Sequence, residues 1–261
     1  MLIVYEHPLS PYAQKVKISL REKGIDFETR LPAGIGTGST SDDFMTGNPR
    51  GEVPFLRDGD AAIFDSTIIL EYIEDKWPTP PMLPDTPLDR ARVRLIEDVM
   101  DCHYEPINWG LGELNSFKRA TGALADRITA RAGEQVAGLH QWLERELGDR
   151  DWFNGGTFGW GDLSVVPYIN GSAGFGFTPP KGSKLEAWHK RAMDRTSVST
   201  SAQEAVDSVS GMQDVSGAVE AGLFKREYRD HRLEWMIKSG GLDVVLKGLE
   251  KDNIRFTPDF S

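Results

Sequence analysis

The chain is short of three things: cysteine, long apolar runs and basic residues. Its single cysteine, Cys102, leaves no partner for an intrachain disulfide and builds no cysteine-rich metal site. No apolar run approaches the roughly 20 residues of a membrane span, and residues 1–6 are too short, with too polar a continuation, for a signal peptide. With 30 basic against 40 acidic residues, the net charge of −10 disfavours nucleic acid and anionic membranes as partners. We therefore expect a soluble, cytoplasmic protein in a reducing compartment.

The spacings typical of metal and nucleotide sites are also missing. The sequence has no His-x-x-x-His pair, no paired-carboxylate motif and no phosphate-binding loop, so we expect neither a metal nor a nucleotide. What it does have is core-forming material, with 39% hydrophobic residues including 7 Trp and 12 Phe. A length of 261 residues allows two modest domains or one large one.

Residues 48–71 carry the densest set of local structure signals. Two short apolar runs, 55–56 and 62–64, flank Asp58-Gly59, a pair that is typical of a hairpin turn. Residues 65–67, Asp-Ser-Thr, then offer capping side chains ahead of an apolar helical face. The segment therefore predicts a strand, a tight turn, a second strand and a helix.

The same segment suggests a binding edge. Pro54 at a strand entry indicates an edge or a bend, with a cis bond as one way to form it, and this would leave the peptide groups of Val53 free for an extended ligand. A helix N-terminus capped by Ser66 would favour a carboxylate. Ordinary hairpin and cap residues are the alternative interpretation.

The first 77 residues read as one small α/β domain. A buried strand at 2–6, a helix from Pro11 to Lys23 and a half-buried strand at 25–31 form a βαβ unit. With the hairpin and a helix at 66–76, they predict the βαβ-ββα arrangement of a thioredoxin-like domain. A loop rich in Gly, Ser and Thr separates the two halves.

Helical patterns dominate after a proline-rich linker at 78–87, so we expect an all-α domain over 88–209 and a helical extension over 210–261. The extension has the pattern of two amphipathic helices separated by Gly240-Gly241, which we expect to pack as far as the pocket rim; a lid over the pocket or a partner surface is the alternative. Candidate helices of the all-α domain are 88–119, interrupted around Pro106 and the glycines at 110 and 112, then 124–147, 161–173 and 183–195.

The residues of the 48–72 segment resemble the soluble glutathione transferases, whose pattern there is N-P-x-G-x-V-P-x-L-x-D-x-x-x-x-x-[ED]-S-x-x-I-x-x-Y. The resemblance covers residues 1–208 and implies the glutathione transferase fold. Two positions depart from the family: Gly159 replaces a capping Ser or Thr three residues before Asp162, and Thr196 replaces a proline. The matching residues are Asn48, Pro49, Gly51, Val53, Pro54, Leu56, Asp58, Asp65, Ser66, Ile69 and Tyr72.

The resemblance implies a glutathione site in the first domain. It implies that Val53, before Pro54, pairs with the cysteinyl part of glutathione, that Asp65 meets the γ-glutamyl ammonium and that Ser66 holds the γ-glutamyl carboxylate. Glu52 stands where the family often has lysine or glutamine, so the glycyl end would be held from the 34–44 loop, with Arg50 as a further candidate.

The thiol activator of this family lies at the start of the first helix, where the helix dipole favours a thiolate. The stretch Ser10-Pro-Tyr-Ala-Gln-Lys is similar to the Cys-Pro-Phe-Ala-Gln-Arg of the omega class, with serine in place of the reactive cysteine. We therefore expect Ser10 to be the activator, a role compatible with an N-cap before Pro11. Tyr12 and Tyr5 are the alternatives.

The acceptor pocket of this family lies between the domains, along the first long helix. Residues expected there are Tyr12, Met100, Cys102, His103, Tyr104 and Trp109, of which half must belong to the core. The resemblance implies a glutathione S-transferase that uses glutathione as co-substrate, forms a homodimer and attacks a small hydrophobic electrophile by substitution, ether or halide cleavage, or isomerisation. A non-catalytic glutathione-binding or assembly module is the alternative. A glutathione-dependent disulfide oxidoreductase is disfavoured because position 10 is not cysteine.

Overall fold

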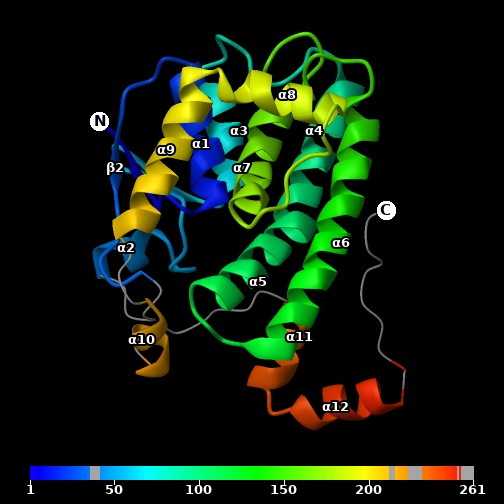
Figure 1. The fold of residues 1–261 in the computed structure, drawn as a ribbon. Coiled ribbons are helices and arrows are strands. Elements are labelled where there is room, and N and C mark those ends of the chain that lie inside the picture. The colour runs from blue at the N-terminus through cyan, green and yellow to red at the C-terminus, as the bar shows by residue number, and fades with distance from the viewer. Residues whose placement is uncertain (36–41, 212–214, 223–230, 252, 254–261) are drawn as a thin grey trace.

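The computed structural model describes residues 1–35, 42–211, 215–222, 231–251 and 253 (Figure 1). Its strands all lie in the first 64 residues and form one sheet of four, in the order β2-β1-β3-β4. This confirms the predicted division into an α/β region followed by a helical region. The strands are β1 (Leu2–Tyr5), β2 (Phe27–Arg30), β3 (Phe55–Asp58) and β4 (Ala61–Phe64).

The sheet has the predicted βαβ-ββα topology. Helix α1 (Pro11–Glu22) connects β1 to β2, which run parallel, whereas β3 is antiparallel to both β1 and β4. The β3–β4 turn falls at Gly59, where φ is +60°, a conformation that glycine adopts without a steric penalty. Helix α3 (Ser66–Lys76) follows directly after β4.

The two faces of the sheet bury different clusters. Leu2 and Val4 point into the main core, while Tyr5 packs on Phe44 and Phe55, with ring centroids 5.7 and 5.4 Å away. Phe44 comes from α2 (Asp42–Gly47), a short helix that we did not predict within a loop rich in small polar residues. The Tyr5 ring is part of this aromatic cluster, and its role as an alternative thiol activator stays a prediction.

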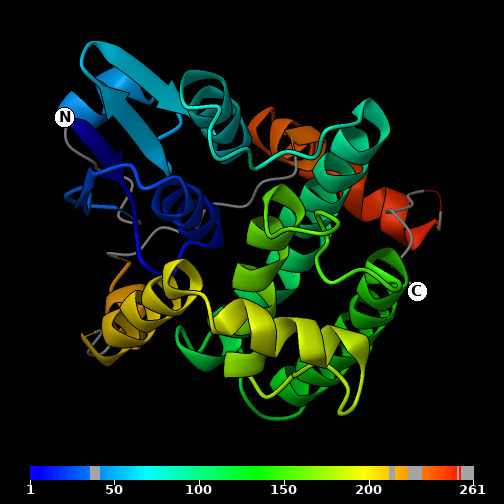
Figure 2. The ribbon, with the colours of Figure 1, turned by 90° about the horizontal axis from the view of Figure 1, so that it is seen from above.

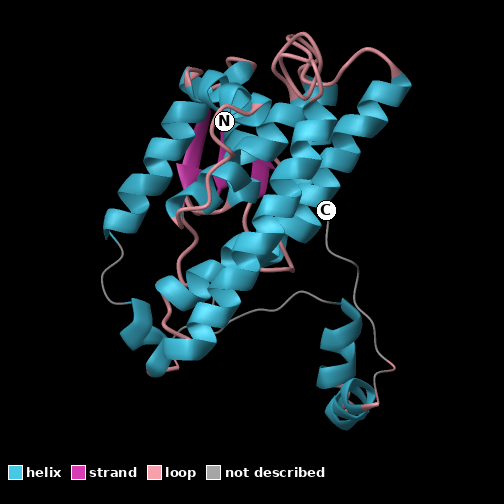
Figure 3. Ribbon diagram, turned by 45° about the vertical axis from the view of Figure 1, so that its right-hand side comes forward, coloured by secondary structure: helices cyan, strands magenta, loops and turns pink. Residues whose placement is uncertain are grey.

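In the described part of the second region, helices joined by loops are found and no strand (Figure 3). The interruption expected around Pro106 lies earlier, in the π-helical turn η1 (Met100–Tyr104), and helix continues through the glycines at 110 and 112. Pro106 follows η1 directly in a backbone that stays helical from α4 to α5, so its missing N–H removes one backbone hydrogen bond that a regular helix would form there. The helices are α4 (Pro87–Val99), α5 (Glu105–Asn115), α6 (Gly122–Leu147), α7 (Trp160–Gly174), α8 (Lys184–Met193) and α9 (Thr196–Gly211), the last of which we did not predict.

Helix α1 is the element that joins the two regions. It packs against α3, α7 and α9, between the sheet and the helical domain (Figure 2). Its contacts with the segment around α9 are ionic: Lys17 Nζ lies 2.7 Å from Glu204 Oε2, and Arg195 Nη2 lies 2.5 Å from Glu22 Oε2. The Lys17 side chain is wholly buried, so this seam places charges in the interior.

The C-terminal extension contains α10 (Val215–Glu220), α11 (His231–Lys238) and α12 (Leu242–Glu250), the last two meeting at Gly240-Gly241 as predicted. Trp235 and Val244 remain 66% and 60% exposed, so these helices do not show the packing at a pocket rim that we expected. Part of the extension, and residues 36–41 of the loop expected to hold the glycyl end of glutathione, lie outside the described residues. None of the described helices combines the length and apolar character needed to cross a bilayer.

Candidate functional site

Ser10 is the N-cap of α1, as the sequence predicted. Its Oγ accepts a hydrogen bond from the Ala13 N–H at 3.3 Å, and Pro11 follows at the first helical position. The side chain is half-buried. Because the cap bond uses an oxygen lone pair, the hydroxyl proton can still be donated to an anion at the positive end of the helix dipole.

The start of α3 differs in detail from the prediction that Ser66 caps it. Asp65 is the N-cap: its Oδ1 accepts from the N–H groups of Thr67 and Ile68 at 3.1 and 3.4 Å. Asp65 has a φ of 77° and a ψ of 123°, which lie outside the left-handed helical region, so its backbone is strained. Ser66 is instead the first helical residue and is 6% exposed. The predicted carboxylate site is therefore a helix N-terminus whose cap is itself acidic.

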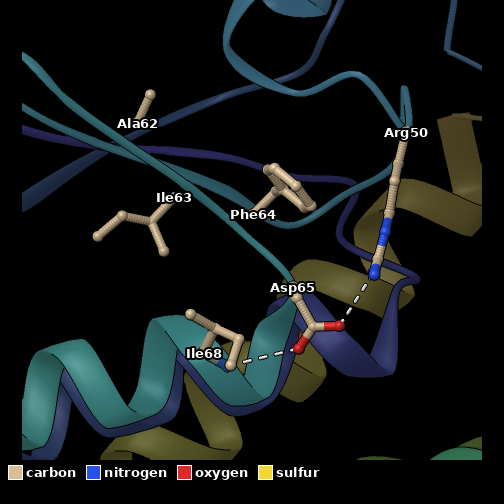
Figure 4. Close-up of a pocket in the computed structure, with 6 residues that line it drawn as sticks. All are labelled: Arg50, Ala62, Ile63, Phe64, Asp65 and Ile68. Atoms are coloured by element: carbon tan, nitrogen blue, oxygen red, sulfur yellow. Dashed lines mark hydrogen bonds and ion pairs between the residues drawn. The ribbon is translucent and has the colours of Figure 1, made fainter.

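Arg50 is the counter-charge of this cap. Its guanidinium lies 3.0 Å from Asp65 Oδ2, and it covers the Phe64 ring with a centroid distance of 5.2 Å (Figure 4). A hollow of about 450 Å³ opens here on the outer side of β4 and reaches Asp65, but Ser10 does not line it. Its lining residues are Arg50, Ala62, Ile63, Phe64, Asp65 and Ile68.

The strand entry has the geometry of a free edge. The Val53-Pro54 bond is cis, and the β1–β3 ladder begins only at the Tyr5–Phe55 pair, so Val53 lies beyond the paired part of β3. The carbonyl of Glu52 accepts from the Asn48 side-chain amide, which fixes the turn before it. Pro54 is buried.

Two of the residues predicted for the acceptor pocket lie in the core. Met100 and Tyr104 are fully buried, and the Tyr104 hydroxyl lies 2.7 Å from His140 Nε2 and 2.9 Å from Ser172 Oγ, so these two belong to the part of the set that was expected to be core. His103 and Trp109 are half-buried.

Tyr12 and Cys102 lie outside this core: Tyr12 is half-buried and Cys102 is exposed. The Tyr12 hydroxyl donates to the carbonyl of Asp101 at 3.0 Å, and its ring meets the edge of Tyr168 with centroids 6.4 Å apart. Despite this exposure, partial desolvation of the Cys102 thiol, together with the neighbouring Asp98 and Asp101, raises its pKa to about 11. It is therefore a thiol at neutral pH rather than a reactive thiolate.

Sequence reasoning missed a buried ionic cluster beside these residues. Lys15 Nζ lies 2.5 Å from Glu97 Oε1 and 2.7 Å from Asp101 Oδ2, and the lysine side chain is completely buried. Burial alone would lower the pKa of Lys15, but Asp101 and Glu97 outweigh it and the pKa is raised. Burial raises the pKa of Asp101, against the opposing effect of Lys15. The only signal in the sequence was the four-residue spacing of the two carboxylates.

The described residues contain no group of three or more His, Cys, Asp or Glu side chains arranged to hold a metal ion. Polar chemistry is instead concentrated at the first turns of α1 and α3 and in the cluster beneath them. This arrangement suits an anionic, peptide-like ligand that spans the two helix N-termini.

Comparison with known proteins agrees with this geometry. Residues 4–81 match the family described as glutathione S-transferase, N-terminal domain. A stringent starvation protein A homolog of Haemophilus influenzae is 30% identical over 74% of this chain and 86% of its own length. Glutathione S-transferase U28 of Arabidopsis thaliana is 29% identical over 78% of this chain and 89% of its own. The solved structure of rice GST1 in complex with glutathione superposes with a TM-score of 0.66 at 28% identity, covering 80% of this chain and 96% of that one.

Proposed function

This chain belongs to the glutathione S-transferase superfamily, and from that premise we propose that it binds glutathione across the first turns of α1 and α3 and presents the thiolate to a small hydrophobic electrophile. The single observation that carries this proposal is the geometry of Ser10. Its Oγ is held in place by the Ala13 N–H while its proton remains available for an anion at the helix N-terminus.

The rest of the glutathione molecule would be held by the strand entry and by α3. The unpaired edge at Val53 suits the cysteinyl peptide groups, the N–H groups at Ser66 suit the γ-glutamyl carboxylate, and Asp65 suits the γ-glutamyl ammonium. Arg50 already pairs with Asp65, so glutathione binding requires that this ion pair open or share the carboxylate. Glu52 would repel the glycyl carboxylate, which places that end away from it.

The electrophile would enter on the side of Tyr12. The Tyr12 hydroxyl donates to the Asp101 carbonyl, so the Tyr12 ring has a fixed orientation at the boundary between the domains. Substitution, ether or halide cleavage and isomerisation all begin with the same thiolate. A homodimer in the cytoplasm is the assembly that we propose from the family resemblance.

A non-catalytic assembly function is the second candidate. The observation that favours it is the exposure of large apolar side chains on α11 and α12, with Trp235 at 66%. A disulfide oxidoreductase has less support, because a mixed disulfide with glutathione needs a protein thiolate and position 10 offers a hydroxyl.

Calorimetric titration of glutathione into wild type, Ser10→Ala and Ser183→Ala tests the proposal, with thiolate absorbance followed against pH. Ser183 is a matched control because it caps α8 in the same way, accepting from the Glu186 N–H at 3.0 Å, far from the site. We expect both variants to lose about 1 kcal/mol of stability with their cap. Only Ser10→Ala should raise the thiol pKa of bound glutathione, by about one unit or more, and slow the reaction with chlorodinitrobenzene at least tenfold.

Two results would contradict the proposal. If wild type binds no glutathione, the transferase function falls and the assembly function becomes the leading candidate. If Ser10→Ala and Ser183→Ala give the same thiol pKa as wild type, glutathione is bound but Ser10 does not activate it.

A further inference from the structure

The side chain of Lys15 lies wholly inside the protein, at the boundary between the two domains. Its partners are Glu97 and Asp101, which belong to α4 and to the turn η1 of the helical domain. A lysine ammonium loses its hydration in such a place, a cost that only close counter-charges and hydrogen bonds offset. Lys15 is therefore fixed at one point by charges that the first domain does not supply.

This cluster touches the first turn of α1. The Tyr12 hydroxyl donates to the Asp101 carbonyl at 3.0 Å, and the Lys15 ammonium lies 5.8 Å from the Tyr12 ring centroid. Tyr12 is two residues from Ser10, so the helical turn that presents the predicted activating hydroxyl is anchored to Asp101.

The cluster also touches the first turn of α3. The Thr67 hydroxyl donates to Glu97 Oε1 at 2.9 Å, and this is the same oxygen that accepts from Lys15 at 2.5 Å. Thr67 follows Ser66 directly, so the N-terminus that would hold the γ-glutamyl carboxylate is anchored to the same carboxylate as α1.

Helix α7 closes the cluster from the other side. Trp160 Nε1 donates to Glu97 Oε2 at 2.6 Å, and the Tyr168 hydroxyl donates to Asp101 Oδ1 at 2.5 Å. All four carboxylate oxygens of Glu97 and Asp101 thus have a donor. Both rings belong to the buried helix of the second domain, which leaves the two carboxylates little freedom to move.

We propose that Lys15 is a positioning residue of the glutathione site, holding the first turns of α1 and α3 at a fixed separation through Glu97 and Asp101. This inference rests on the proposed function, since it assumes that glutathione spans those two turns. Lys15 does not contact the ligand in this arrangement. It determines whether the hydroxyl of Ser10 and the N–H groups at Ser66 meet one molecule at the same time.

The test compares Lys15→Met with Lys23→Met. Lys23 is the matched control: its side chain is also wholly buried, and at the far end of α1 it pairs with Glu74 and with the carbonyls of Trp77 and Pro80, each at 2.7 Å. Thermal unfolding, glutathione affinity by calorimetry and the thiol pKa of bound glutathione are measured for wild type and both variants. We expect both variants to unfold at a lower temperature.

Only Lys15→Met should weaken glutathione binding, by about tenfold, and raise the thiol pKa of bound glutathione. Lys15 has neighbours in the first turns of α1 and α3, whereas Lys23 has none there. Lys15→Arg, which keeps the charge, should restore most of the affinity. Equal glutathione affinity and thiol pKa in Lys15→Met and Lys23→Met would overturn the inference and leave Lys15 a structural residue.

Thr67→Val provides a test that does not depend on a buried charge. It keeps the side-chain volume and removes only the hydrogen bond to Glu97, so the protein should fold and its glutathione affinity should fall several-fold. An unchanged affinity would contradict the inference even if Lys15→Met does not fold. Failure of wild type to bind glutathione would instead reject the proposed function and, with it, this role for Lys15.

Discussion

The carbonyl of Met82 accepts a hydrogen bond from the Trp160 N–H at 2.7 Å, and this bond holds the start of α7 against the linker between the domains. The close approach explains why glycine stands at position 159. A Cβ at Gly159 would overlap the Met82 carbonyl and the Asn154 side chain. The cap is completed by Asp162, whose Oδ2 accepts from the Gly159 N–H at 3.1 Å.

Gly159→Ser should therefore destabilise the protein, although serine is ordinarily the better N-cap. The added Cβ and hydroxyl must displace a backbone carbonyl, which we expect to cost about 2 kcal/mol and to lower the melting temperature by several degrees. Calorimetric unfolding measures the change. Gly174→Ala, at the other end of α7 where a Cβ has open space, is the control and should change stability by less than about 0.5 kcal/mol. If Gly159→Ser were more stable than wild type, the Met82 carbonyl of the linker would have to move aside at little cost.

Replacing Asp65 separates its capping role from its charge. Asp65→Asn keeps an acceptor for the Thr67 N–H and a side chain of the same shape, so its stability should stay within about 0.5 kcal/mol of wild type. Its glutathione affinity should fall roughly fivefold, because a partly exposed charge pair with the γ-glutamyl ammonium is worth about 1 kcal/mol.

Asp65→Ala is the comparison for this prediction. It should lose the same affinity and, in addition, about 1–2 kcal/mol of stability with the cap. Denaturant unfolding and calorimetric titration measure the two quantities. Full affinity in Asp65→Asn would mean that in wild type the Asp65 carboxylate stays paired with Arg50 and that the γ-glutamyl ammonium is bound elsewhere.

The Tyr104–His140–Ser172 triad predicts a pH dependence of stability. Burial lowers the pKa of His140 to about 4 from an ordinary value of 6.5, with His189 adding to the effect. The unfolded chain then binds more protons than the native protein between these two values. The stabilising contribution is complete above pH 6.5 and is lost as the pH falls toward 4, by at most about 3 kcal/mol.

His140→Gln should flatten this slope because glutamine cannot take up the proton. Urea unfolding at a series of pH values gives the slopes. Ser172→Ala, which removes a hydrogen bond to Tyr104 without removing a titratable group, should lower stability equally at all pH values and keep the slope of wild type. Parallel slopes for wild type and His140→Gln would show that His140 is accessible to protons in the native state.

Local signals account for the parts of the fold that could be predicted. Asp58-Gly59 marked the β3–β4 turn, and Ser10 and Pro11 marked the start of α1, because both features depend on neighbouring residues alone. The η1 turn lies just before Pro106, the residue that drew the prediction, and its own bounds could not be predicted because no proline or glycine lies in it.

The residues of the candidate site could be predicted only in the segments that match the family pattern, 48–72 and the start of α1. The burial of Lys15 was not predicted because lysine is rarely buried. Its local sequence also gives no sign of its contacts with Glu97 and Asp101, more than 80 residues away in the chain. The crowding at Gly159 and the core position of Tyr104 likewise depend on contacts with distant segments.

The charged seam along α1 limits how this protein could have been assembled from parts. A gene fusion or recombination at the linker would bring in a new first domain with its own α1. Such a hybrid would leave Glu97, Asp101 and Glu204 facing side chains chosen for other neighbours, since Lys15 and Lys17 now meet them in the interior. The two regions are separate in sequence, but exchanging one of them would leave these buried charges without their present partners.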